Sequence, residues 1–154
     1  MEGKLMLDET ELHKNRDKFL IKANAYNKLK KTQFEMEREY FLEHCDLLDL
    51  AGYPTPDALR LIENWHHEYA VTWFEFIHSL WYASDWGWKS EVVPHRFREG
   101  RNVMQFDVST AGWSGNESIV NSMQKNEMLW WKTHYQTRRG GHYIFELEIE
   151  DVSR

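Results

Sequence analysis

The stretch that decides the fold is NVMQFDVSTAGWSGNE, which covers residues 102–117. In its first half, Met104, Phe106 and Val108 alternate with mostly polar neighbours, which predicts a half-buried strand. Two glycines follow, and the chain then begins a helix that we place at about 115–135. The centre of the C-terminal half is therefore predicted to be a strand, a tight turn and a helix.

Two further strands are predicted on either side of this stretch. Residues 86–93 precede Pro94, which ends a strand or confines it to a sheet edge because proline has no N–H to donate. After a turn at Gly140 and Gly141, residues 143–150 again alternate apolar and polar side chains. The order β-β-α-β predicts a small three-stranded sheet in an α+β fold.

The first part of the chain reads as a helical arm. Residues 9–49 contain neither Gly nor Pro and are rich in Lys, Glu and Leu, which predicts one long amphipathic helix or two helices broken near Lys30 and Lys31. Charge is segregated along this arm. Residues 14–31 carry seven basic side chains and one acidic, whereas residues 35–49 carry six acidic and one basic. Such runs are either solvated helix faces or the two halves of an antiparallel self-pairing that makes a homo-oligomer.

Helices continue up to the first strand. The segment 52–54 (GYP) ends the arm, and Thr55 followed by Pro56 is typical of a helix start. A further short helix is predicted over residues 69–81, where apolar and aromatic side chains recur at helical spacing. We therefore divide the chain into an N-terminal helical arm, residues 1–51, and a compact α+β domain, residues 52–154.

Composition limits the classes of partner. A net charge of −6 and a pI near 5.7 argue against non-specific binding to nucleic acid or to an anionic membrane. The sequence contains no run of 18 apolar residues, which a membrane-spanning helix would need. Residues 1–8 lack the apolar core of a signal peptide. The single cysteine, Cys45, is consistent with a reducing cytoplasm. The eight histidines have no metal-ligand spacing, so neither a metal nor a cofactor is expected.

Two glycine-bearing segments are the candidate functional end of the protein. The loop 112–117 leads into a helix, where exposed N–H groups attract anions, and the segment 138–143 joins two arginines to two glycines. The alternative is that both are capped turns that serve only the fold. A helix of ~20 residues between them would be ~30 Å long and would hold them apart. The candidate ligand-binding residues are Thr110, Gly112, Trp113, Ser114, Gly115, Asn116, Arg138, Arg139 and His142.

Three side chains near these segments are candidates for catalysis. Asp107 and Glu117 flank the loop as paired carboxylates, and His142 follows the second glycine pair. No lysine follows in a nuclease-like spacing, so we favour a binding protein over an enzyme. Its ligand would be an anionic small molecule, such as a nucleotide, or a host protein. The alternatives are a metal-dependent hydrolase or nucleic-acid-processing enzyme, and a structural or assembly protein that acts through the arm.

The motifs STAGWSGNE (109–117) and RRGGHY (138–143) resemble those of a family of small uncharacterised phage-encoded proteins. The segments GYPT (52–55) and DWGW (85–88) are also similar to that family, in which glycine stands where this chain has Ala111. The resemblance implies a phage accessory protein in the host cytoplasm, with a role in host interaction or anti-defence. It implies no catalytic activity and no catalytic residue.

Overall fold

The computed structural model describes residues 8–149, and the chain divides into two units that meet between Glu37 and Arg38. One unbroken helix, α1 (Glu9–His44), passes from the first unit into the second, so the break considered at residues 30–31 is absent. Helix α1 ends at His44 because the chain then makes a turn closed by the Asp49 carboxylate, which accepts the N–H groups of residues 51 and 53.

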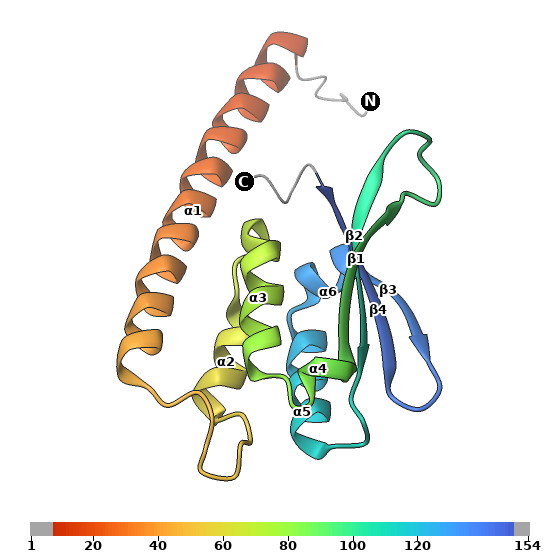
Figure 1. The fold of residues 1–154 in the computed structure, drawn as a ribbon. Helices are drawn as coiled ribbons and strands as arrows, with labels where there is room; N and C mark the ends of the chain where they lie inside the picture. The colour runs from red at the N-terminus through yellow and green to blue at the C-terminus, as the bar shows by residue number, and fades with distance from the viewer. Residues whose placement is uncertain (1–7, 150–154) are drawn as a thin grey trace, which may run out of the picture. The chain divides into compact units, whose positions relative to one another are not determined.

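The second unit holds the remaining helices and the sheet (Figure 1). Thr55 caps the helix that follows it by accepting the N–H of Ala58, as the sequence predicts. The elements in chain order are α2 (Pro56–Asn64), a 3-10 turn (His67–Tyr69), α3 (Ala70–Leu80), α4 (Ser84–Gly87), β1 (Trp88–Pro94), β2 (Asn102–Ser109), α5 (Ser114–Lys125), α6 (Glu127–Thr133), β3 (His134–Arg138) and β4 (His142–Glu148).

The sheet is antiparallel throughout, with the strand order β1-β2-β4-β3. The α+β class with a helical first half is confirmed, and β1 ends at Pro94 on a sheet edge as expected. The expected three-stranded sheet is wrong by one strand. Strand β3 pairs with β4, and its five residues are mostly exposed and polar, so they give no apolar alternation to recognise.

The helix expected over residues 115–135 is also wrong, because Asn126 divides it into α5 and α6. The side-chain amide of Asn126 donates to the carbonyl oxygens of Ile62 (3.1 Å) and Trp65 (2.9 Å), and its oxygen accepts the N–H of Leu129 (3.3 Å). The same residue therefore ends α5, caps α6 and ties both to the end of α2. The chain then has enough residues left to form β3 before the glycine pair.

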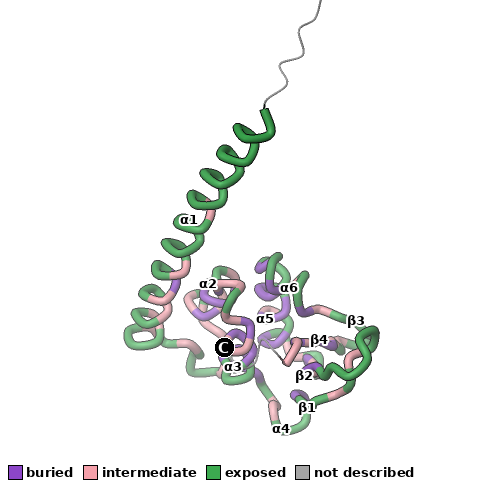
Figure 2. The backbone as a smooth tube through the Cα atoms, turned by 90° about the horizontal axis from the view of Figure 1, so that it is seen from above, coloured by how far each residue is buried: buried purple, intermediate pink, exposed green. Residues whose placement is uncertain are grey.

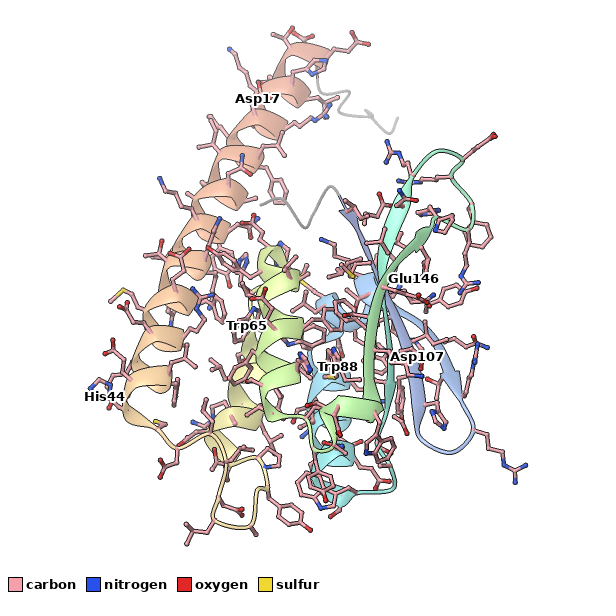
Figure 3. The ribbon with its side chains drawn as sticks, viewed as in Figure 1. Asp17, His44, Trp65, Trp88, Asp107 and Glu146 are labelled. Atoms are coloured by element: carbon pink, nitrogen blue, oxygen red, sulfur yellow. The ribbon has the colours of Figure 1, made fainter. Side chains whose placement is uncertain are left out.

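The core of the second unit lies between the helices and one face of the sheet (Figure 2). Phe74 of α3 stacks on Phe106 of β2, with ring centroids 4.3 Å apart, and also meets Phe145 of β4. Trp88 faces α3, whereas Asp107 and Glu146 lie on the opposite, open face of the sheet (Figure 3). Among the described residues, no helix has both the length and the apolar character needed to cross a membrane.

Candidate functional site

The two glycine-bearing segments meet at one end of the sheet. Strand register places Ser109 opposite His142, and the N–H of Thr110 donates to the carbonyl of Gly141 at 2.9 Å. Gly141 has a φ of +79°, and a Cβ at this position would collide with the Thr110 hydroxyl. The expected separation of the segments is therefore wrong. Because the helix is short and β3 returns along β4, the β2–α5 loop and the β3–β4 turn lie side by side (Figure 1).

Two of the candidate ligand-binding residues have side chains directed into the fold. Asn116 is fully buried, and its amide accepts the N–H of Tyr82 at 3.0 Å and donates to the carbonyls of Tyr82 and Thr110. Thr110 is also buried, and its hydroxyl accepts the N–H of Gly112. These contacts fix the loop against the segment before α4.

Aromatic side chains cover the start of α5. The indole of Trp113 lies between the rings of Tyr53 and Tyr82, with centroid distances of 4.6 and 4.7 Å. It also lies over Gly115, where an added Cβ would overlap the ring. Ser114 contacts the Tyr53 hydroxyl at 3.3 Å. Trp113 therefore packs beside the first turn of α5, next to the helix start that the sequence offers as an anion site.

A cleft opens instead beside the glycine segments, on the open face of the sheet. This open-face cleft has a volume of about 230 Å³. Its polar side chains come from three strands, and one exposed indole from α4 forms a wall. The lining residues are Trp86, Gly87, Lys89, Asp107, Ser109 and His142.

Strand register explains why these side chains converge. Lys89 of β1 lies opposite Asp107 of β2, and His142 of β4 lies between Ser109 and Arg138 in a row across three strands. Directly opposed residues of antiparallel strands point to the same face, so both rows project from the open face. Two of the three candidate catalytic residues, Asp107 and His142, therefore line one cleft.

The floor of the open-face cleft depends on a close approach between α4 and β2. The indole N–H of Trp81 donates to the carbonyl of Ser109 at 3.1 Å. A Cβ at Gly87 would lie 3.2 Å from that same carbonyl oxygen, which is tighter than ordinary contact. Glycine at this position lets α4 sit against the end of β2 and brings Trp86 to the edge of the cleft.

The far half of the open face is occupied by ion pairs. Arg96 binds Glu146 at 3.0 Å, and its guanidinium lies 4.1 Å from the centroid of the Tyr135 ring. Arg98 binds Glu148 at 2.9 Å. Because these arginines are already paired with carboxylates, this half of the face is less suited to an incoming anion than the open-face cleft.

The remaining candidate residues lie outside the cleft. Arg138 is next to it through its pairing with His142, and Arg139 is exposed in the β3–β4 turn. Glu117 is exposed on α5 and does not line the cleft with Asp107. Within residues 8–149, no group of three or more His, Cys, Asp or Glu side chains is arranged to hold a metal ion.

Sequence reasoning missed Trp86 and Lys89 as lining residues. Lys89 could have been found from strand geometry, because neighbouring residues of a strand point to opposite faces of the sheet. Trp88 faces the core, so Lys89 must face outward. Trp86 stands in the segment DWGW (85–88), and more than half of its surface is exposed. An exposed indole next to a required glycine was the available clue.

A second group of aromatic residues lies on α6. Trp130 packs against Phe145 and His134, whereas the next residue, Trp131, is 89% exposed. Neighbouring residues of a helix point about 100° apart, so these two indoles have different surroundings. Burial lowers the pKa of His134, whose ring stacks on Trp130 at 4.4 Å, so its neutral form is favoured.

No protein-family model, curated protein or solved structure matches this chain. The geometry of the described residues, above all the open-face cleft, is therefore the basis for a functional proposal.

Proposed function

We propose that this chain is a non-enzymatic binding protein whose open-face cleft takes a small anionic ligand with a planar ring, such as a nucleotide. The observation that carries the proposal is the convergence of Lys89, His142 and Trp86 on one cleft beside the two glycine segments. The phage accessory role and the host cytoplasm remain expectations that rest on the motif resemblance.

Charge supports an anionic ligand. Lys89 and His142 line the cleft, Arg138 lies in the same row as His142, and Arg139 follows in the adjoining turn. Asp107 lies opposite Lys89 and balances its charge, so the excess of positive charge comes from Arg138 and Arg139 beside the cleft. A single guanidinium group donates two parallel hydrogen bonds to a phosphate or carboxylate, so each of these arginines favours a ligand with such a group at this edge.

The size of the cleft favours a small ligand. Its volume of about 230 Å³ lies below the ~300–1,000 Å³ of typical small-molecule sites. It would therefore enclose one ring and one anionic group rather than a whole dinucleotide. The ring would stack on the indole of Trp86, an interaction worth ~1–3 kcal/mol for a nucleobase.

Titration calorimetry on the full chain tests the proposal. The probes are nucleoside monophosphates, cyclic nucleotides and inorganic phosphate, with the uncharged nucleosides as the comparison. We expect the charged nucleotides to bind more tightly than the nucleosides, and Lys89→Gln to remove most of that difference. Absence of heat with every charged probe would refute the proposal.

Two matched controls separate the cleft from general surface effects. Trp86→Ala is expected to weaken nucleotide binding roughly tenfold through lost stacking. Trp131→Ala removes another exposed indole, which lies outside the cleft, and should leave affinity unchanged. Lys28→Gln, on α1, makes the same charge change as Lys89→Gln and should also have no effect. Equal losses in the test and control variants would count against a specific site.

The second candidate function is hydrolysis, because Asp107 and His142 line the same cleft. A carboxylate and an imidazole in one cleft are able to share acid and base roles on a bound phosphoester. Incubating the protein with nucleotides and single-stranded DNA, with and without Mg²⁺ or Mn²⁺, distinguishes the two. Product that disappears in Asp107→Asn and in His142→Gln would favour the enzyme over the binding protein.

A further inference from the structure

Helix α1 carries six exposed apolar side chains in one sector of its surface, which we call the stripe. An α-helix advances about 100° per residue, and on this basis the six residues fall within a sector of about 120°. Each is between 51% and 70% exposed. The stripe consists of Leu12, Phe19, Tyr26, Leu29, Met36 and Tyr40. The buried residue of α1, Phe34, points about 100° away from the centre of this stripe, so the stripe is a separate face.

Polar residues share this sector and interrupt the stripe. On the same basis they are Glu11, Asn15, Lys18, Lys22, Lys30, Gln33, Glu37 and His44, and Glu43 lies about 20° beyond the edge of the sector. Their charges give the stripe a direction, because the lysines precede Gln33 and the acidic residues Glu37 and Glu43 follow it. Pairing two α1 helices in parallel would put Lys22 beside its own copy and Glu43 beside its own copy. Antiparallel pairing avoids both repulsions, because it brings the basic half of one helix to the acidic half of the other.

We propose that α1 pairs antiparallel with α1 of a second copy of this chain, through the stripe. Aligning Tyr26 with Met36 of the second copy brings Lys18 to within one residue of its Glu43, and Lys22 to within one residue of its Glu39. This alignment overlaps residues 18–44 of each helix, a length of ~40 Å. The overlap is close to four heptads, which is the length at which a heptad repeat indicates a coiled coil.

The physical reason for pairing is the cost of an exposed apolar face. A single helix in water is marginally stable, and most helices in proteins are stabilised by packing their apolar side. In the pair, the apolar side chains of each stripe would leave water. Lys22 within the stripe and Lys18 at its edge would meet glutamates that flank the seam, as charged residues do in coiled coils. This inference is independent of the open-face cleft, which uses no residue of α1.

Charge reversal with rescue tests the pairing. Light scattering behind size exclusion should show a concentration-dependent dimer of the full chain. Lys18→Glu with Lys22→Glu, or Glu39→Lys with Glu43→Lys, should each weaken the dimer by roughly tenfold or more, since every pair becomes repulsive. Mixing the two double variants should restore dimers, because each lysine again meets a glutamate.

A matched control tests whether the effect is specific to the stripe, and a cross-link tests whether the pairing is antiparallel. Arg16→Glu with Lys28→Glu makes the same charge change outside the stripe and should leave the dimer intact. In a Cys45→Ser background, Tyr26→Cys mixed with Met36→Cys should form a disulfide between chains, whereas Tyr26→Cys alone should not. In the proposed pairing, two cysteines at position 26 would be ~15 Å apart along the helix, beyond disulfide reach.

The proposal is overturned by any of three results. The first is a monomer at every concentration, which would mean that the stripe is solvated or covered by its own chain. The second is a control variant as disruptive as the test variants. The third is cross-linking of Tyr26→Cys to itself, which would indicate parallel pairing.

Discussion

Replacing Asn116 by alanine should destabilise the protein far more than its position in the polar first turn of α5 suggests. The side chain is fully buried and makes three hydrogen bonds to the backbone: one from the N–H of Tyr82, one to the carbonyl of Tyr82 and one to the carbonyl of Thr110. Alanine removes all three and puts no other polar group in their place. The β2–α5 loop would then lose its attachment to the segment before α4.

The expected loss follows from the groups left without partners. A buried polar group that loses its hydrogen bond costs ~1–3 kcal/mol. The two groups of Tyr82 are partly exposed and regain some hydration, so we expect a total of about 2–4 kcal/mol. For a domain of this size that lowers the Tm by roughly 10 °C.

Chemical and thermal unfolding of Asn116→Ala and Asn121→Ala provides the assay. Asn121 is an exposed residue on the same helix, so its replacement controls for the change in helix propensity and should cost little. Asn116→Asp should be at least as harmful as Asn116→Ala, since it turns a donor of two hydrogen bonds into a buried carboxylate. If Asn116→Ala and Asn121→Ala unfold at the same temperature, the reasoning is refuted.

Three further predictions follow from single residues. Gly141→Ala should lower the Tm more than Gly140→Ala, because both have positive φ (79° and 91°) but only at Gly141 would the Cβ collide with a neighbour; equal losses would contradict this. Burial lowers the folded pKa of His134 below its ordinary 6.5, so as pH falls the unfolded chain takes the proton first. Stability should therefore decline between pH 6.5 and the lower folded pKa, and unfolding curves of His134→Gln should lack this component of the decline. Desolvation, and then the Asp57 carboxylate, raise the pKa of Cys45 from its ordinary 9.0. Its thiol should therefore react with a disulfide reagent at neutral pH more slowly in the folded chain than in the unfolded chain. A faster reaction in the folded chain would contradict this prediction.

Substitutions at Gly87 and Trp81 should affect the open-face cleft indirectly. Gly87 and Trp81 hold α4 against the carbonyl of Ser109, so substitutions at either would displace Trp86 without touching a ligand. Effects of Gly87→Ala on binding would therefore report positioning of the wall, whereas effects of Trp86→Ala would report direct contact.

The sequence by itself determined the elements whose signals are local. The absence of Gly and Pro over residues 9–49 predicted α1, and alternation predicted β2 and β4. Thr55 before Pro56 predicted the start of α2, which the structure has with the expected cap. These features succeed because helix propensity, capping and strand alternation act between residues within a few positions of one another.

Tertiary structure alone decided where the helix breaks and what the two glycine segments do. Asn126 ends α5 because its amide reaches carbonyls of Ile62 and Trp65, more than sixty positions away in the sequence. Because the helix ends early, residues remain for β3, an exposed edge strand. The sequence of β3 has no apolar alternation, and it is a strand because it pairs with β4. The same register brings His142 to Ser109 and creates the open-face cleft. Such contacts form between segments that are distant in the sequence, so local sequence patterns do not predict them.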